Sequence, residues 1–429
     1  MKKKGPADRK RSGKELFGWV MFDFANSSFT TVIVTVIFSA YFVSHIVGDK
    51  ISGVKYWGWG VALSNLIVIM LAPVAGAIAD YSGAKKRFLV ATSLICVGFT
   101  ALLFFAREGN ILLALTFFII ANIGFSAGEG FIAAFLPEIA KPEEMGKISG
   151  YGWAFGYVGG LISLLLCLAL FKLWGQGEAQ IRFTFLITAL FFLISAIPTF
   201  LFLRERKEAV HLPAGKSYLN IGFGRIKDTF REIQTFRQLP RFLFSFFLYS
   251  CGIATIISFS AIYAENVLHF SKAETLIFFI VVQVASSAGA FCFGLVEDRI
   301  GAKKTIAITL VIWLAVIILV YWSPTKAVFW LAGNLAGLAI GASQSSSRAM
   351  VALFTPAQKS GEFFGFWGLS GKLAATVGIY SYSMMTQLSG SMRTAILSTG
   401  IFFLLGLIAL SFVDEEEGKK AASRYKELT

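Results

Sequence analysis

Long apolar stretches recur along nearly the whole chain and restrict its fold more than any other feature. Each is close to the length of about 20 residues that a helix needs to cross the hydrocarbon core of a bilayer. Charged residues make up 15% of the chain, compared with roughly 25% in soluble domains, so a soluble fold is excluded. We therefore expect an all-α membrane protein with twelve transmembrane helices. Their expected ranges are 17–46, 56–80, 87–106, 111–138, 148–172, 181–203, 240–266, 273–297, 304–322, 327–354, 362–388 and 392–413.

A loop motif occurs twice and indicates that the chain consists of two related halves. Residues 76–86 and 294–304 both read Gly-x-x-x-Asp-x-x-Gly-x-Lys-Lys, and the copies start 218 residues apart, about half the chain. Duplications of this period are typical of transporters built from two pseudo-symmetric six-helix bundles. The expected domains are an N-terminal bundle with a basic tail (1–203), a basic cytosolic linker (204–239) and a C-terminal bundle with a cytosolic tail (240–429).

The basic residues concentrate on one side of the expected membrane spans. The N-terminal tail, both loop motifs, the central linker and the C-terminal tail all fall on the same side. Cytosolic segments carry the excess of Lys and Arg in membrane proteins, so we expect both termini in the cytosol and the chain in the plasma (inner) membrane. Membrane topology accounts for the net charge of +14 without a nucleic-acid partner. The expected partners are membrane lipid, a small-molecule substrate and protons as coupling ion, and we expect a monomer.

The loop motif predicts a conformational latch at the cytosolic ends of the second and eighth spans. Its first glycine allows close contact with a neighbouring helix, and its aspartate can bind the positive N-terminal end of a helix from the other half. The plainer alternative is a helix-ending glycine followed by lysines that only set topology. The predicted latch residues are Gly76, Asp80, Gly83, Lys85, Lys86, Gly294, Asp298, Arg299, Gly301 and Lys303.

The motif resembles the loop signature of the major facilitator superfamily, with Tyr81 in place of the usual arginine in the first copy. Six segments carry a narrower resemblance: 22–28, 135–139, 148–154, 341–348, 362–366 and 370–372. They are similar to the vacuole-effluxer branch, which is related to the autophagy-linked vacuolar amino-acid exporter. In the seventh span Cys251 stands where this resemblance leads us to expect an acidic residue. The resemblance implies secondary active efflux of small solutes such as amino acids.

Ionisable and polar side chains within the spans are candidates for substrate or proton binding, because they are costly in lipid. Glu129 and Lys372 lie at a similar depth in opposite halves, so they either pair or hold the two ends of a zwitterionic substrate. Glu129 and Asp23 are the candidates for proton coupling. The alternative for Asp23 is local hydrogen bonding. The predicted residues of this site are Asp23, Asn26, Glu129, Tyr157, Tyr249, Gln344 and Lys372.

Two further patterns favour structural roles. Arg348 is expected to form an ion pair with Glu362, which lies one short loop away. Glycines four residues apart predict tight helix packing, or faces that slide during transport. These glycines are Gly152, Gly156 and Gly160 in the fifth span and Gly333, Gly337 and Gly341 in the tenth.

The sequence gives no support for catalysis or for a cofactor. The Gly-x-Ser-x-Gly pattern at 124–128 lies inside a span, a phosphate-binding Gly-x4-Gly-Lys-Ser/Thr pattern is absent, and no cysteine has a partner at metal-binding spacing. We expect a secondary transporter of a small polar or zwitterionic solute, with amino-acid-like efflux. The alternatives are a transporter of a larger amphipathic solute, such as a sugar conjugate, peptidoglycan fragment or lysolipid, and a non-transporting membrane receptor or scaffold.

Overall fold

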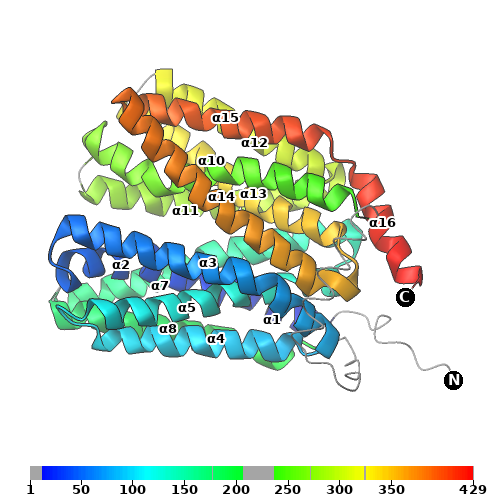
Figure 1. Ribbon diagram of the computed structural model, residues 1–429, viewed down its shortest axis with the longest axis horizontal. Coiled ribbons are helices and arrows are strands. Elements are labelled where there is room, and N and C mark those ends of the chain that lie inside the picture. Colours follow the sequence, from blue (N-terminus) through cyan, green and yellow to red (C-terminus); the bar gives the residue numbers. More distant parts are fainter. Residues whose placement is uncertain (1–11, 176, 206–235, 271, 323–324, 429) are drawn as a thin grey trace. The chain divides into compact units, whose positions relative to one another are not determined.

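The computed structural model describes residues 12–175, 177–205, 236–270, 272–322 and 325–428, and all regular elements in these ranges are helices (Figure 1). The first group is α1 (Gly13–Ser28), η2 (Phe29–Val36), α2 (Phe38–Tyr41), η3 (Phe42–Ile46), α3 (Lys50–Ser82), α4 (Lys85–Leu102), η4 (Leu103–Phe105), α5 (Ile111–Ala133), α6 (Leu136–Ile139), η5 (Pro142–Glu144), α7 (Met145–Trp174) and α8 (Glu178–Phe202). The second group is α10 (Gln238–Asn266), α11 (Lys272–Ile300), α12 (Ala302–Trp322), α13 (Lys326–Leu353), η7 (Ala357–Lys359), α14 (Ser360–Ser389), α15 (Met392–Ser411) and α16 (Glu415–Leu428).

Ten helices in the described ranges are long and apolar enough to cross a membrane, and an eleventh counts if Tyr56–Ala72 and Val74–Ser82 form one bent span. The stretch expected at 362–388 forms the long helix α14 but is not among them. Its second half is rich in hydroxyl side chains, and it carries Lys372, so its mean hydropathy falls below that of the other spans.

The expected span 111–138 is divided in the structure. Helix α5 ends at Ala133, and the short helix α6 follows with Pro137 in its first turn. Proline has no N–H to continue the hydrogen-bond ladder of α5, which explains the break. Two carbonyl groups at the break accept side-chain donors instead: Trp19 Nε1 donates to Ile132 O (2.8 Å), and Lys85 Nζ donates to Ala134 O (3.5 Å).

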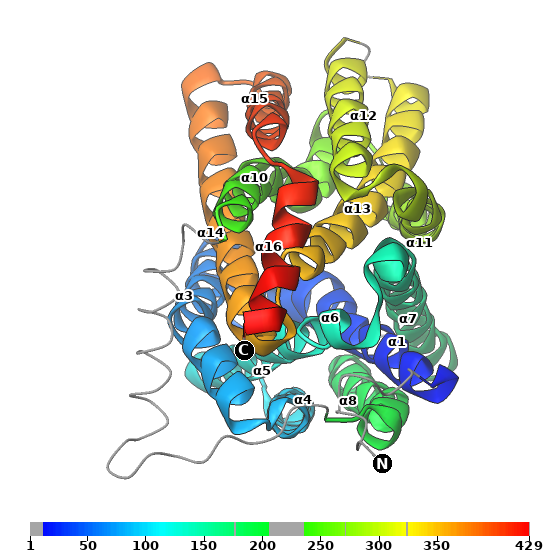
Figure 2. The same cartoon turned by 90° about the vertical axis from the view of Figure 1, so that its right-hand side faces the viewer.

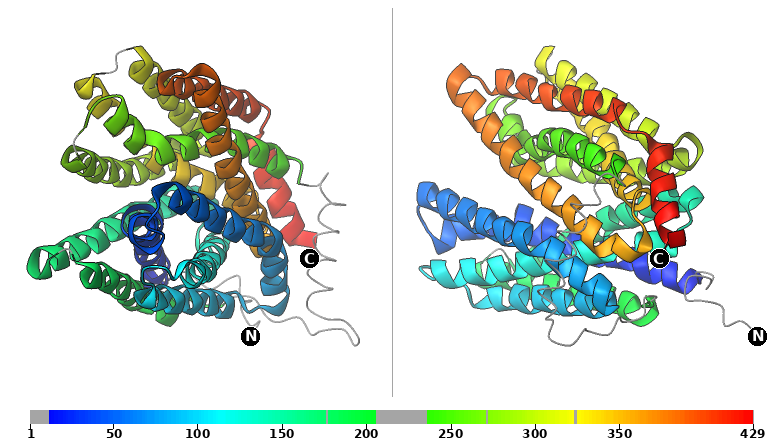
Figure 3. Two further views of the ribbon diagram at one scale, coloured as in Figure 1. Left: turned by 60° about the vertical axis from the view of Figure 1, so that its left-hand side comes forward. Right: turned by 45° about the vertical axis from the view of Figure 1, so that its right-hand side comes forward.

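The chain divides into two compact units, and their internal packing follows the same pattern. Unit 1 comprises Met1–Ile139 and Phe155–Phe223, and unit 2 comprises Ala140–Ala154 and Gly224–Thr429. In unit 1, α4 packs on α5 and α8, α1 packs on α8, and α3 packs on α5, with the helices side by side along their lengths (Figure 3). In unit 2, α12 packs on α13 and α15, α10 packs on α15, and α11 packs on α13. These pairs correspond one to one, as a duplicated sequence would require.

The unit boundaries differ from those expected from the sequence in one respect. The first turns of α7, up to Ala154, group with unit 2, although the expected fifth span belongs to the N-terminal half. The expected linker 204–239 lies outside the described residues between positions 206 and 235, as does the basic tail before residue 12. At the other end, the expected cytosolic tail forms helix α16, which crosses the ends of α10 and α13 within unit 2 (red in Figure 2).

The glycine series on α13 is confirmed as a packing surface. A Cβ added at Gly337 would lie 2.8 Å from Val282 O, and one added at Gly341 would overlap Ser286 O. Both contacts are with the backbone of α11. The spacing of four residues therefore places small residues on the one face of α13 that approaches α11 most closely.

Candidate functional site

The two copies of the loop motif fold in the same way. Helix α3 is followed by Gly83 (φ 59°) and helix α11 by Gly301 (φ 89°), both in the left-handed region that favours glycine. The next helix then starts within two residues, α4 at Lys85 and α12 at Ala302. The sequence thus predicted correctly that each motif joins two long helices by a tight turn.

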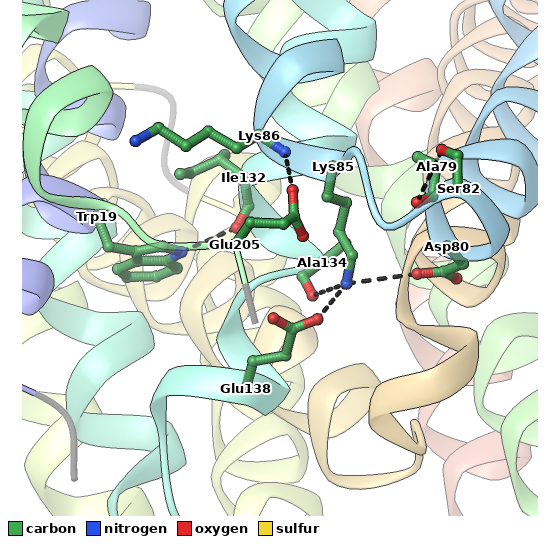
Figure 4. Close-up of polar contacts among 10 residues, drawn as sticks. All are labelled: Trp19, Ala79, Asp80, Ser82, Lys85, Lys86, Ile132, Ala134, Glu138 and Glu205. Atoms are coloured by element: carbon green, nitrogen blue, oxygen red, sulfur yellow. Dashed lines mark hydrogen bonds and ion pairs between the residues drawn. The ribbon is translucent and has the colours of Figure 1, made fainter. Parts of the chain in front are cut away.

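In the first copy, Lys85 lies at the centre of a buried charge cluster (Figure 4). Its side chain has no exposed surface, and its Nζ lies 3.4 Å from Asp80 Oδ1 and forms an ion pair with Glu138. The ammonium group also lies 5.5 Å from the centre of the Phe135 ring. Lys85 therefore connects α3, α4 and the segment after α5. Burying these charges carries a desolvation penalty, which their mutual attraction must offset. Removal of any one partner would leave an uncompensated charge in the interior.

A glutamate that follows α8 in unit 1, and one that follows α15 in unit 2, cap the helix after each loop. In unit 1, Glu205 Oε2 accepts the backbone N–H of Lys86 at 2.7 Å (Figure 4). In unit 2, Glu415 accepts the backbone N–H of Lys303 at 3.0 Å and that of Ala302 at 3.4 Å. The first N–H groups of a helix have no partner within it, so a carboxylate there is favourable. Sequence reasoning missed both residues, although each follows the last residue of its span by a few positions.

The variant Glu205→Gln is expected to lose less stability than the wild type as the pH rises. Burial raises the pKa of Glu205 above its ordinary value, and the N–H of Lys86 opposes this shift only in part. The folded state therefore binds this proton more tightly than the unfolded chain, so wild-type stability falls between about pH 4.3 and the raised pKa. Glutamine keeps an acceptor for Lys86 and does not ionise. Melting temperatures of both proteins in one detergent, from about pH 4 to about pH 8, check this. Parallel curves would contradict it.

In the second copy, the aspartate contacts the start of a helix, and its role in a latch stays a prediction. Asp298 Oδ1 accepts the backbone N–H of Lys147 at 3.2 Å, in the first turn of α7. Close backbone approach supports this contact, because a Cβ added at Gly294 would lie 2.8 Å from Gly146 O. Arg299 is exposed, while Lys303 Nζ donates to Ser411 O (3.1 Å) and Val413 O (2.6 Å). The second loop is thus fixed to the end of α15 and the residues that follow it.

A serine-rich turn of α13 is the hydrogen-bonding centre of unit 2. Ser346 Oγ donates to Glu297 Oε2 of α11 at 2.6 Å, and Ser347 Oγ shares a hydrogen bond of 2.6 Å with the Tyr249 hydroxyl of α10. The carbonyl oxygen of Ser345 accepts from Ser149 Oγ of α7 at 2.7 Å. Three successive residues therefore contact three different helices, which explains why this turn is polar and buried.

Arg348 continues this turn and contacts the start of α7. Its Nη2 donates to Ser149 O at 2.8 Å, its Nε donates to Ser149 Oγ at 3.1 Å, and its guanidinium lies 5.4 Å from the Trp153 ring centre. Glu362 is fully buried at the start of α14. The ion pair between Arg348 and Glu362 stays a prediction.

The residues predicted to bind substrate or protons are distributed over both units. In unit 1, Asp23 and Glu129 are partly exposed, whereas Asn26 is buried and its Oδ1 accepts no hydrogen bond from the described residues. In unit 2, Tyr249 is fully buried, and its hydroxyl group is hydrogen-bonded to that of Ser347. Their assignment to one site stays a prediction. The remaining members, all partly exposed, are Tyr157, Gln344 and Lys372.

Comparison with known proteins agrees with this architecture. The model of the family described as vacuole effluxer Atg22-like matches residues 45–423. An uncharacterized MFS-type transporter of Bacillus subtilis, YxiO, is 31% identical over 98% of this chain and 99% of its own length. Autophagy-related protein 22-1 of Aspergillus niger is 25% identical over 66% of this chain, and the match spans about half (49%) of that protein.

Solved structures show the same fold at low sequence identity. The human organic anion transporter MFSD10 matches with a TM-score of 0.75 over 92% of this chain and 99% of its own, at 15% identity. The major facilitator superfamily transporter FucP in its outward conformation matches with a TM-score of 0.72 over 94% of this chain and 98% of its own, at 13% identity. The resemblance found in the sequence is thereby confirmed, and neither family nor fold is that of an enzyme. The chain belongs to the vacuole effluxer Atg22-like family of major facilitator superfamily transporters.

Proposed function

We propose that this transporter exports a small polar or zwitterionic solute of the amino-acid type and that protons drive the export. The observation that carries the proposal is the presence of ionisable groups on the membrane-spanning helix α5 and on α14. Glu129 and Lys372 are each partly exposed within their own units, on the long helices α5 and α14. Groups of opposite charge suit the amine and the carboxylate of a zwitterion, and charged residues at this depth are retained for function.

The proposed arrangement in the membrane has twelve spans in two six-helix bundles. It counts α14 as a span despite its polar half, because a helix that faces a polar pathway need not be apolar all round. Both termini lie in the cytosol of a monomeric protein of the plasma membrane. The concentration of Lys and Arg at the loop motifs and termini supports this orientation.

The transport cycle that we propose alternates access by opening and closing contacts near the loop motifs. Asp298 accepts the N–H of Lys147 in the closed state and loses this bond when α7 moves away from α11. Asp80 and Lys85 keep the first loop rigid through their buried pair. The glycines of both motifs allow close approach without requiring new side-chain packing. The closed state is thus stabilised by discrete contacts that must break before the other state can form.

The test is uptake of labelled solutes into proteoliposomes with an imposed pH gradient. The panel contains amino acids, dipeptides, sugars and lysolipids, and Glu129→Gln and Lys372→Ala are compared with the wild type. We expect flux of an amino-acid-like solute that depends on the pH gradient. We expect both variants to reduce it by at least about tenfold, the effect of losing roughly 1.4 kcal/mol of binding energy.

Thermal stabilisation by the same solutes separates the remaining possibilities. A transported solute should raise the melting temperature of the wild type by mass action and not that of either variant. Flux of lysolipids or sugar conjugates alone would replace the amino-acid assignment with an amphipathic substrate. Absence of flux and of stabilisation across the whole panel would favour the receptor or scaffold.

A further inference from the structure

Glu297 is a buried carboxyl group that the loop motif itself does not require. It precedes the motif aspartate Asp298, and its exposed fraction is 3%. The same position in the first copy is Ala79, which is fully buried. Both copies form the same turn, so the fold accepts an alanine at this position. A second acidic residue inside α11 therefore needs an explanation other than the architecture of the loop.

The surroundings of Glu297 provide for only one of its two carboxyl oxygens. Oε2 accepts a hydrogen bond of 2.6 Å from the hydroxyl group of Ser346, whereas Oε1 is buried without a hydrogen-bond partner among the described residues. The charged groups that act on it are the neighbouring Asp298, and Glu415 and Lys419 from α16. The two carboxylates outnumber the single ammonium group, which itself pairs with Glu415 at 2.8 Å.

Glu297 also packs directly on the start of α7. A Cβ added at Gly146 would lie 2.7 Å from the carboxyl carbon of Glu297. At the same place Asp298 accepts the N–H of Lys147. The charged groups that act on Asp298 here are Lys147 of α7 and Glu144 of η5. From α13, Arg348 donates to Ser149. Asp298 thus binds the positively polarised start of α7. Among the described residues, Glu297 accepts no hydrogen bond from α7.

These contacts favour different charge states of Glu297 in different conformations. A buried carboxylate oxygen without a donor is costly, and a helix terminus compensates only weakly, whereas a neutral carboxylic acid avoids most of this cost. Separation of α7 from α11 would expose the same group to water, where the charged form is well solvated. Proton binding and the α7–α11 contact must then strengthen each other.

We propose that Glu297 is a proton-binding site of the transporter, which is protonated while α11 packs on the start of α7 and releases its proton when this contact opens. The proposal rests on the proposed proton-driven transport and names a residue for it. A polar cavity of about 830 Å³ borders the group and gives protons a route to it. Its walls include Glu143, Glu297, Asp298, Lys303, Glu415 and Lys419.

The first test records infrared difference spectra of the full-length protein during a pH titration. We expect a carbonyl band of a protonated carboxylic acid that persists above about pH 5, beyond the ordinary range of glutamate. The Glu297 component of this band, distinct from that of Glu205, should be absent from Glu297→Gln and from Glu297→Ala, which restores the residue type of the first copy. It should remain in the control Glu143→Gln, an exposed glutamate at the same cavity. A band that is unchanged in both Glu297 variants would overturn the proposal.

The second test measures the α7–α11 contact itself. The rings of Tyr151 and Phe291 stack with centroids 5.6 Å apart, so cysteines at these positions report the contact through a short bifunctional thiol reagent. The exposed Cys292 is replaced by serine in all proteins. The cross-linking rate, divided by that of the same protein carrying Glu297→Gln, should fall with rising pH, by up to about tenfold per pH unit. A ratio that is constant with pH would refute the coupling.

Neither test depends on a known substrate, so failure of the two proposals can be told apart. If the infrared band and the pH-dependent cross-linking are found but no solute shows flux that depends on a pH gradient, the proton site stands and proton-driven export falls. If such flux is found and is unchanged in Glu297→Gln, together with an unchanged infrared band, proton-driven export stands and the assignment of Glu297 falls.

Discussion

Replacement of Lys85 by methionine should destabilise the protein by about 3–5 kcal/mol, the cost of breaking a buried ion pair by removing one partner. Lys85 has no exposed surface and supplies the cation between Asp80 and Glu138. Methionine fills a similar volume but leaves the two carboxylates to repel each other in a region of low polarity. The measurement is the melting temperature of the purified protein in detergent, together with the fraction recovered as a monodisperse species.

The duplication supplies a matched control for this prediction. Lys303 occupies the same position in the second motif, but it is partly exposed and donates to carbonyl oxygens at and just after the end of α15. Lys303→Met should therefore cost about 1 kcal/mol, the typical net value of a hydrogen bond. Equal losses for the two variants would show that burial of the charge is not the cause.

A triple variant tests the charge argument directly. If the loss in Lys85→Met comes from repulsion between carboxylates, then adding Asp80→Asn and Glu138→Gln should restore most of it. Replacing a complete buried ion group by neutral residues of similar volume is often close to neutral for stability. Failure of the added substitutions to restore stability would instead assign the loss to the packing of Lys85 against Phe135.

The sequence predicted the helical membrane fold, the duplication and the two turns well, because these depend on local patterns. Gly83 and Gly301 are needed where the chain must enter the left-handed region, and apolar length alone marks most spans. Local patterns did not show how two of the expected spans are built. The hydroxyl-rich second half of α14 lowers its hydropathy below that of the other spans, and Pro137 divides the stretch 111–138 into α5 and α6.

The partners of the candidate site were harder to predict, because they come from distant parts of the chain. The sequence marked Lys85 and Lys86, but nothing local shows that Glu138 lies beside Lys85, 53 residues further along, or that Glu205 binds the N–H of Lys86, 119 residues further along. Glu415 likewise appeared to be part of a charged tail. A position-by-position comparison of the two halves was the available signal. Glu205 follows α8, Glu415 follows the corresponding helix α15, and Glu297 stands where the first half has Ala79.

Replacement of Gly341 by alanine should also have a large effect, in spite of adding only one methyl group. Its Cβ would overlap Ser286 O and lie 2.7 Å from Ala290 N, so only movement of the α11 backbone makes room. Overpacking against a backbone costs about 1–3 kcal/mol and often more. Helix propensity alone would favour alanine over glycine by about 1 kcal/mol. A net loss of stability in Gly341→Ala would therefore come from the contact with α11.

Gly368→Ala is the control for this contact, because an added Cβ at Gly368 would have no atom within 4 Å. Both glycines lie within long helices of unit 2, and the same propensity term applies to both. We therefore expect opposite shifts in melting temperature: a fall for Gly341→Ala and a rise for Gly368→Ala, measured in one detergent. A higher melting temperature for both variants would contradict the prediction. It would mean that α11 and α13 can move apart at no cost in stability, so that their close contact does not stabilise unit 2.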